Sequence, residues 1–313
     1  MKTRLVFCML SLMMLLWVVS AQAMTLRTQW VPQAQFAGYY MALEKGFYKK
    51  AGIDLEIRDG GPGLNALREV SSGDVDFATG WLISAMRLRA KGEKLVLIGQ
   101  VFQRSALLLL SMKSKGIDSV EKFSGQSMGV WPGDFQLPPK ALIRKHRVRN
   151  VKIVDQGFSM GPFIKGELNI ASAMTYNEYH QVLEAGVKKE DLVVFNYGDL
   201  GMNLPEDGIY AHESLAKKDP ALCRKFMEVT LEGWRYAFDH KDETTKLMTE
   251  LANRTEFKTT EKKQRLMLDE VERLIDLESF DLKKADFRTA LEVLKSTRII
   301  KKDLDMDAFV MTK

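Results

Sequence analysis

From residue 25 onward, short runs with the period of a β-strand alternate with runs that have the period of a helix. The stretch at 53–58 shows the strand pattern clearly, because Ile53, Leu55 and Ile57 alternate with charged residues. This first series predicts strands at 25–30, 53–58, 75–78 and 95–101 and helices at 34–45, 64–70 and 82–90. Repeated βα units of this kind predict a parallel sheet covered by helices on both faces.

A second, smaller α/β series follows the polar stretch at 113–116. It predicts strands at 127–130, 151–154, 171–174 and 192–195 and helices at 137–145, 161–165 and 177–185. Beyond Asp219 the strand pattern nearly vanishes, and the chain predicts amphipathic helices at 221–238, 243–251, 260–277 and 283–294. Such helices need a surface to pack on, and we expect the first unit to provide it.

The order of these segments predicts an α/β protein with two lobes. We expect residues 24–112 and 208–313 to form lobe 1, with the C-terminal helices as an extension of it, and residues 113–207 to form lobe 2. The chain would return to lobe 1 near residues 208–211. Two crossings between the lobes make a hinge and leave a cleft.

The N-terminus has the features of a secretory leader. Lys2 and Arg4 precede an apolar run at 5–19, and a small-x-small sequence ends at Ala23. We therefore expect residues 1–23 to be a signal peptide that is cleaved after Ala23, so that the mature protein is exported.

Composition and charge exclude several classes of function. A formal net charge of +5 over 313 residues is too small for the basic footprint of a nucleic-acid-binding protein. Cys8 lies in the expected leader, which leaves Cys223 alone in the mature chain, so neither an internal disulfide nor a cysteine-based metal site can form there. The four histidines have no spacing typical of metal ligands. We expect no catalytic residues, no metal and no cofactor.

Candidate ligand-binding residues follow the predicted strands, because open α/β sheets bind ligands outside the carboxyl ends of their strands. Several of these residues are aromatic, and a ring at a cleft can stack on a flat heteroaromatic ligand for roughly 1 kcal/mol beyond area burial. The candidate set comprises Trp30, Gln35, Tyr39, Gly61, Gly63, Asn65, Trp81, Arg104, Trp131, Tyr176, Asn177 and Glu178.

Some of these candidates have a second interpretation. Trp30 and Tyr39 face either the cleft or the core. The glycine-rich turn before Asn65 either points backbone N–H groups at a ligand or is only a tight turn. Arg104 either binds a carboxylate, sulfonate or phosphate or is a solvated or lobe-bridging side chain. Asn177, with its neighbour Glu178, either hydrogen-bonds an amino-pyrimidine edge or only caps a helix.

Three segments of the sequence carry a resemblance to a known family. They are TQWVPQAQFAGYYMALEKGFYKKAGIDLEI, GGPG and DVDFATGW. The chain resembles the periplasmic solute-binding proteins of ABC importers for sulfonates, nitrate and thiamine pyrimidine precursors, in the branch that is similar to the yeast thiamine-pyrimidine synthase. MTYNEYHQVLEAG and EDGIYAHESLAKKDP resemble the second lobe and the return crossing, so the resemblance covers most of residues 25–240.

The resemblance implies a type II periplasmic-binding-protein fold, in which two α/β lobes close over a ligand. It implies ligand contacts at Trp30, Gly61 to Asn65, Trp81, Trp131 and Tyr176 to Glu178. Gln29 stands where pyrimidine binders often carry an acidic residue. The synthase members need a cysteine-rich motif, and a mature chain with one thiol departs from it.

The combined expectation is a non-catalytic periplasmic protein that binds a small molecule and hands it to an importer permease in the inner membrane. The ligand would be a thiamine pyrimidine precursor or a similar heteroaromatic or anionic compound, and the protein would act as a monomer. Three alternatives stay open: a sensory module that signals to a membrane partner, a sulfonate- or nitrate-type binding protein, and an enzyme of the pyrimidine-synthase type.

Overall fold

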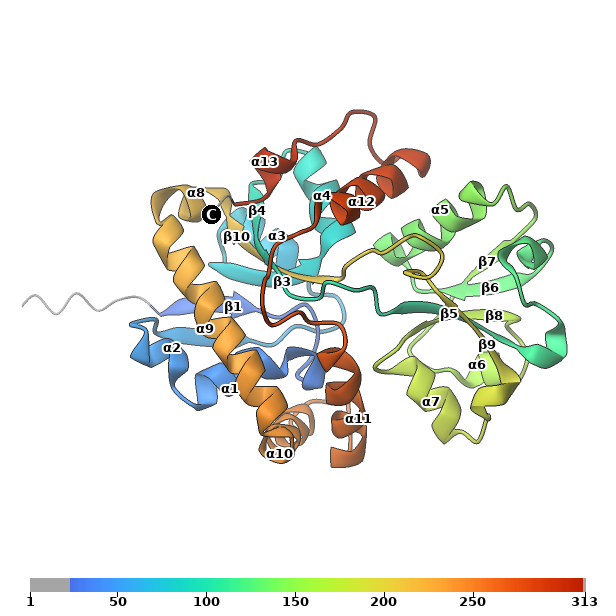
Figure 1. Ribbon diagram of the computed structural model, residues 1–313, viewed down its shortest axis with the longest axis horizontal. Coiled ribbons are helices and arrows are strands. Elements are labelled where there is room, and N and C mark those ends of the chain that lie inside the picture. The colour runs from blue at the N-terminus through green and yellow to red at the C-terminus, as the bar shows by residue number, and fades with distance from the viewer. Residues whose placement is uncertain (1–22, 312–313) are drawn as a thin grey trace, which may run out of the picture.

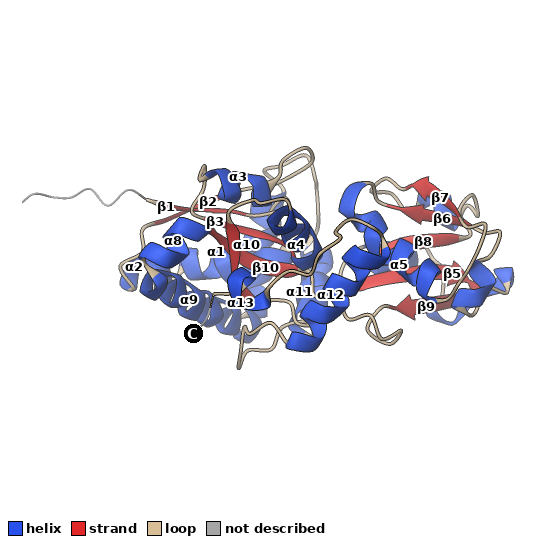
Figure 2. Ribbon diagram, turned by 90° about the horizontal axis from the view of Figure 1, so that it is seen from above, coloured by secondary structure: helices blue, strands red, loops and turns tan. Residues whose placement is uncertain are grey.

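Two five-stranded sheets, one in each lobe, form the framework of the protein (Figure 1). The computed structural model describes residues 23–311, so nearly all of the expected signal peptide at 1–23 lies outside the described residues. The two lobes lie side by side and are joined by extended segments, which both views show (Figures 1 and 2). The α/β architecture with two lobes is confirmed.

Lobe 1 contains the first sheet, in the strand order β2-β1-β3-β10-β4. Its strands are β1 (Met24–Arg27), β2 (Leu55–Arg58), β3 (Phe77–Trp81), β4 (Leu95–Gln100) and β10 (Asp207–His212). The helices between these strands are α1 (Ala37–Glu44), α2 (Phe47–Lys50), α3 (Ala66–Ser72) and α4 (Leu82–Ala90).

Lobe 2 contains the second sheet, in the strand order β7-β6-β8-β5-β9. Its strands are β5 (Leu107–Met112), β6 (Ser127–Val130), β7 (Lys152–Asp155), β8 (Ile170–Met174) and β9 (Leu192–Asn196). Its helices are α5 (Leu137–Lys145), α6 (Gly161–Ile164) and α7 (Glu178–Glu184).

The first crossing between the lobes lies earlier in the chain than expected. β5 pairs with β8 and β9 of the second sheet, so residues 107–112 belong to lobe 2 and not to lobe 1. The physical reason is that Leu107 to Leu110 are all apolar and all buried, so they can fill the centre of a sheet in either lobe. The second crossing ends where β10 begins, at Asp207.

Neither sheet is purely parallel, which corrects the expectation from the βα alternation. β10 runs antiparallel to β3 and β4, and β5 runs antiparallel to β8 and β9. Both are the strands that the chain enters directly after it crosses from the other lobe. In a βα unit the helix carries the chain back, so the next strand runs parallel to the previous one. β5 and β10 each follow an extended crossing instead of a helix, and each runs antiparallel to its neighbours in the new sheet.

The C-terminal segment is helical and covers lobe 1. Its helices are α8 (Glu213–Lys218), α9 (Pro220–Asp239), α10 (Lys241–Ala252), α11 (Glu261–Glu272), α12 (Lys284–Ser296) and α13 (Met306–Phe309). The long helix α9 packs against α1, whereas α12 contacts both α4 of lobe 1 and α5 of lobe 2 (Figure 1). The C-terminal extension therefore bridges the lobes instead of belonging to lobe 1 alone.

Two glycines allow α1 and α9 to pack closely. A Cβ atom on Gly38 would lie 2.3 Å from the indole of Trp234, and a Cβ atom on Gly233 would lie 2.2 Å from the Gly38 carbonyl oxygen. Neither position has room for a side chain. This packing holds the start of α1, and the loop that leads into it from β1, against the C-terminal helices.

Candidate functional site

A cavity of about 920 Å³ lies between the two lobes. The end of β3 and the loops after β1, β2, β6, β7 and β8 line it, together with the N-terminal half of α11. Nine of the twelve residues predicted from the sequence lie in its wall: Trp30, Gln35, Gly63, Asn65, Trp81, Trp131, Tyr176, Asn177 and Glu178. The strand ends of both lobes thus converge on one site, as the position of ligands in open α/β sheets requires.

The other three predicted residues do not line this cavity. Tyr39 is buried in the core of lobe 1, where its ring meets the indole of Trp234 edge-on at 5.8 Å. Gly61 lies behind the cavity wall, near the side chain of Val31. Arg104 lies on the first crossing segment, and its guanidinium donates to the Arg273 carbonyl oxygen at 3.2 Å. Arg104 therefore ties the hinge to the C-terminal segment.

Aromatic rings from the two lobes meet across the cavity. Trp81 of lobe 1 packs edge-on against Phe135 of lobe 2 with ring centroids 4.3 Å apart, and Phe135 also contacts Trp131 at 5.6 Å. Trp30 of lobe 1 lies 5.2 Å from Phe158 of lobe 2 and 5.6 Å from Phe257. Ring pairs with these separations are favourable, so closure of the lobes is stabilised by aromatic contacts on two sides of the site.

A buried carboxylate, Asp207, lies at the base of the cleft. Its Oδ1 accepts from Gln29 Nε2 at 2.6 Å, and its Oδ2 accepts from Gln35 Nε2 at 2.7 Å. Burial raises the pKa of Asp207 to about 7, although the two amide donors act in the opposite direction. Both glutamines line the cavity, so Asp207 determines how two polar side chains of the site are oriented.

A second buried carboxylate, Glu178, lies in the lobe 2 wall at the start of α7. Its Oε2 accepts from the Met174 backbone N–H at 3.0 Å and its Oε1 from Asn177 Nδ2 at 2.8 Å. Burial raises the pKa of Glu178 to about 7. Asn177 makes no side-chain cap bond to α7; its Oδ1 accepts from Gln181 Nε2 at 3.1 Å. Asn177 and Glu178 thus form a polar edge that faces the cavity.

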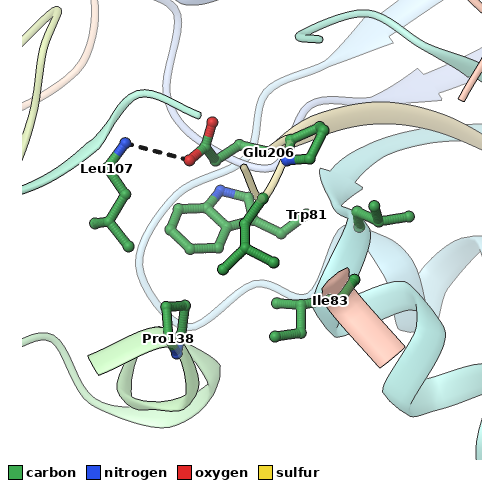
Figure 3. Close-up of a pocket in the computed structure, with 9 residues that line it drawn as sticks. Trp81, Ile83, Leu107, Pro138 and Glu206 are labelled. Carbon is green, nitrogen blue, oxygen red and sulfur yellow. Dashed lines mark hydrogen bonds between the residues drawn. The ribbon is translucent and has the colours of Figure 1, made fainter. Parts of the chain in front are cut away.

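Glu206 joins the two crossing segments of the hinge. Its carboxylate accepts from Ser105 Oγ at 2.7 Å and from the Ala106 backbone N–H at 2.9 Å. Figure 3 shows its further bond to the Leu107 N–H beside Trp81, in a small void that Pro138 of lobe 2 also lines. Burial is the main reason that the pKa of Glu206 is raised to about 8.

The charged side chains of the cleft wall are largely paired with one another across the lobes. Arg87 of lobe 1 lies 2.8 Å from Asp134 of lobe 2, and Lys263 of α11 lies 3.2 Å from Glu184 of α7. Lys258 donates to a backbone carbonyl oxygen at 2.7 Å. Each lysine and arginine in the cavity wall therefore already has a partner of its own.

Besides the strand ends of lobe 1 and lobe 2, α11 and the loop before it form a third wall of the cavity. The sequence analysis did not predict this wall. Phe257, Lys258, Thr259, Lys263, Gln264, Leu266 and Met267 line the cavity from this segment. Gln264 fixes its position, because Gln264 Oε1 accepts from the Ala34 N–H at 2.6 Å. An amphipathic pattern shows that a helix has a buried face, but it gives no signal that part of this face borders a cleft.

A G-x-S-x-G sequence, which is typical of hydrolase nucleophiles, occurs at 157–161, and the sequence analysis missed it. Ser159 is exposed, it is absent from the cavity wall, and its Oγ accepts from the Gly161 N–H at 3.1 Å. No histidine within residues 23–311 is hydrogen-bonded to it. This segment places Phe158 in the cavity wall.

Two further features concern the described part of the chain. Among residues 23–311, no three His, Cys, Asp or Glu side chains are grouped as a metal site requires. None of the helices between these residues combines the length and the apolar character that crossing a membrane takes.

The arrangement of two lobes around a solute-sized cavity defines the class of protein. The fold is that of the periplasmic binding proteins. The structure is similar to the periplasmic aliphatic sulphonate binding protein SsuA from Escherichia coli, with a TM-score of 0.72 and 15% sequence identity over 93% of this chain and 92% of that one.

The family follows from the sequence match. Residues 33–244 match the family described as NMT1/THI5 like, and the chain belongs to this family. The resemblance stated from the sequence motifs is thereby confirmed.

Two curated relatives are binding proteins. The chain is 26% identical to the riboflavin-binding protein RibY of Chloroflexus aurantiacus over 231 residues, which cover 71% of this chain and 64% of the relative. It is 22% identical to the formylaminopyrimidine-binding protein of Halalkalibacterium halodurans over 229 residues, which cover 70% of this chain and 67% of the relative. The match thus spans about two thirds of the length of each relative.

Proposed function

We propose that this chain is the substrate-binding component of an ABC importer and that it captures a flat, uncharged nitrogen heterocycle between its lobes. A thiamine pyrimidine precursor or a flavin has this chemistry. The observation that carries the proposal is the set of aromatic rings that reach the cavity from both lobes, above all Trp30, Trp81, Trp131 and Tyr176. Stacking on such rings is favourable for any planar ligand.

The charges of the cleft support an uncharged ligand. Arg87 and Lys263 are paired with carboxylates of the opposite lobe, so an anionic ligand that used either cation would have to break a contact that holds the lobes together. The uncharged polar groups of the wall include the amides of Gln29 and Gln35, and Asn177 with Glu178 adds a polar edge. Groups of this kind recognise the edge of a heterocycle.

The size and shape of the cavity also support capture of a small molecule. Its volume of about 920 Å³ lies within the range of about 300–1,000 Å³ that is common for small-molecule sites. Because the contacts come from both lobes, a ligand binds the closed state better than the open state and shifts the protein toward closure. An importer permease can then distinguish the loaded protein from the empty one.

The proposal includes location and partner. The leader pattern at 1–23 and the binding-protein relatives support export to the periplasm, cleavage after Ala23, and delivery of the solute to a permease in the inner membrane. Mass spectrometry of the protein recovered from the periplasm tests this step, because the proposal requires Met24 at the mature N-terminus.

Isothermal titration calorimetry tests the ligand class. We expect the purified mature protein to bind formylaminopyrimidine or riboflavin with a dissociation constant in the micromolar range or lower and to bind an alkanesulfonate far more weakly. Tryptophan fluorescence should be quenched in the same titrations, because the ligand would contact indoles. Binding of the alkanesulfonate alone would contradict the proposed ligand class.

A further inference from the structure

The positive charge of the chain is concentrated in one segment of lobe 2, at residues 140–152. This segment contains six lysines and arginines and no aspartate or glutamate. The whole chain has a formal net charge of +5, so all residues outside the segment together carry a net charge of −1. We call the six cations the basic patch; they are Lys140, Arg144, Lys145, Arg147, Arg149 and Lys152.

The cations of the basic patch are not neutralised by carboxylates. Within residues 23–311 none of the six forms an ion pair, whereas Arg87, Arg89 and Lys241 do so elsewhere in the chain. Lys140 and Lys145 donate to oxygens of neutral groups, at 2.7 and 3.1 Å. The other four side chains are exposed and have no hydrogen-bond partner in the described part of the chain: Arg144, Arg147, Arg149 and Lys152.

The backbone holds this segment in a compact turn at the end of α5. The Arg147 N–H donates to the Arg144 carbonyl oxygen at 3.0 Å, and the Val148 N–H donates to the Ile143 carbonyl oxygen at 2.9 Å. Glycine usually occupies the left-handed position of such a helix end, but here Arg147 occupies it with a φ of 55°. The helix dipole favours cations in the last turn of α5, where Arg144 and Lys145 lie. It does not account for the three cations that follow the helix.

The basic patch lies away from the cleft. The loop at 146–151 enters β7 at the amino end of this strand, whereas residues 156–158, which follow its carboxyl end, line the cavity. No residue between 140 and 152 belongs to the cavity wall. A surface that binds the basic patch therefore leaves the solute site uncovered.

We propose that the basic patch docks the protein on an anionic phospholipid surface. This inference goes beyond the proposed function, because it adds a second binding surface to the solute site. Headgroup phosphates form a diffuse plane of negative charge, and each lysine or arginine near such a plane strengthens binding about fivefold. Four side chains that no contact holds in place suit a plane of this kind better than a shaped acidic surface of a protein.

The contact is electrostatic and reversible. Residues 140–152 include no exposed large apolar side chain that could enter the lipid. Attraction to the surface falls off over a Debye length of about 8 Å at physiological salt. The docked protein can therefore move along the membrane in which its importer lies and still be released.

Vesicle flotation tests the proposal. We expect the purified mature protein to float with vesicles of phosphatidylethanolamine and phosphatidylglycerol at low ionic strength, and to stay unbound in about 0.5 M salt. It should also stay unbound with vesicles of phosphatidylcholine, which carry no net charge. Absence of binding to the anionic vesicles at low ionic strength overturns the proposal.

A matched pair of triple variants locates the contact. Removal of three charges of the basic patch should weaken binding to the anionic vesicles at least about tenfold, in Arg144→Gln, Arg149→Gln and Lys152→Gln combined. The control removes three exposed cations of α8 and α9 in lobe 1 that form no ion pair within residues 23–311, by Lys218→Gln, Arg224→Gln and Lys225→Gln. The control should bind within about threefold of the parent protein. Equal losses in the two variants would assign the binding to net charge alone and overturn the proposal.

A charge-preserving variant and a second probe complete the test. Arg144→Lys, Arg149→Lys and Lys152→Arg combined should bind the vesicles as the parent protein does, and a loss here would indicate a shaped site and overturn the proposal. Tight binding of polyglutamate without binding of the anionic vesicles would assign the basic patch to an acidic protein and also overturn it. Calorimetry with the solute reads out the proposed function separately, because the basic patch lies outside the cavity wall.

Discussion

The base of the cleft and its mouth are built differently. At the base, Glu206 and Asp207 are 2% and 1% exposed, and both carboxylates accept several hydrogen bonds from the hinge and from lobe 1. At the mouth, Phe158 is 57% exposed while its ring contacts Trp30, and the ion pair between Lys263 and Glu184 lies near solvent. The base is therefore a fixed frame, and the mouth is the part that must open to admit a solute.

The difference between the base and the mouth of the cleft is tested most strongly by the pH dependence of the free energy of unfolding. Burial raises the pKa of Glu206 to about 8 and that of Asp207 to about 7, from ordinary values of 4.5 and 3.8. At a pH between the ordinary and the raised pKa of each group, that group holds its proton in the folded protein but has released it in the unfolded chain. The free energy of unfolding should therefore be greatest at mildly acidic pH and fall as the pH rises from about 5 to about 8, by at most about 1.4 kcal/mol per pH unit for each group.

Urea unfolding at several pH values between 5 and 9 measures this dependence. Glu178, whose pKa is also raised to about 7, contributes with the same sign. The hydroxyls of Tyr39, Tyr176 and Tyr210 face the charge of Asp207, but burial raises their pKa values and keeps them neutral throughout this window. A protein that became more stable as the pH rose through this range would contradict the description of the base.

The next largest effect is expected from Glu206→Ala. The substitution leaves the Ala106 backbone N–H and the Ser105 hydroxyl without their acceptor in a buried hinge. We expect the free energy of unfolding to fall by about 3 kcal/mol, given roughly 1–3 kcal/mol for each buried group that loses its partner. Glu206→Gln keeps one acceptor oxygen and should lose less. Equal stability of Glu206→Ala and the parent protein, measured by urea unfolding, would show that the base is not a fixed frame.

At the mouth the effect should appear in binding instead of stability. Trp30→Ala removes the ring that contacts both Phe158 and Phe257, and we expect the dissociation constant of the heterocycle to rise about 30-fold, or about 2 kcal/mol. Phe158→Ala should raise it less, because the more exposed ring buries less area. Calorimetry on both variants gives the ranking, and the reverse order would assign the recognition of the solute to lobe 2.

The smallest effect is expected from Glu184→Gln, which breaks the ion pair with Lys263 across the mouth. Pairs this close to solvent contribute about 1 kcal/mol or less and are screened by salt. The dissociation constant should rise by no more than about fivefold at low ionic strength and match that of the parent protein in 0.5 M salt. A larger effect that persists in salt would show that this pair belongs to the fixed frame.

Much of the fold could be predicted because local patterns determined it. Ile53, Leu55 and Ile57 predicted a strand, and β2 lies there. The crossing at 101–106 was not predicted. The apolar run that forms β5 could pack in either sheet, and its sequence does not indicate which one it joins. The helix expected at 260–277 ends at Glu272, since the chain beyond it pairs with the hinge through the Gln103 N–H and the Leu274 carbonyl oxygen at 2.8 Å. Such tertiary contacts override helical periodicity.

The site was predictable where it depends on strand ends and not where it depends on helix packing. Trp30, Trp81 and Trp131 lie in the cavity wall because each ends a strand or follows one by at most three residues. Tyr39 is absent from that wall because α1 turns this ring toward α9, which no local pattern reveals. Phe257 could not be predicted either, because a distant part of the chain brings it there.

The wall formed by α11 lies beyond residue 244, where the match to the family ends. A chain can therefore keep every residue of the family match and still differ in this wall of the cavity. Substitutions at 257–267 change one wall of the cavity without changing a residue of either sheet or of the hinge. Under the proposed function, the choice of solute can change through a segment that the family match does not cover.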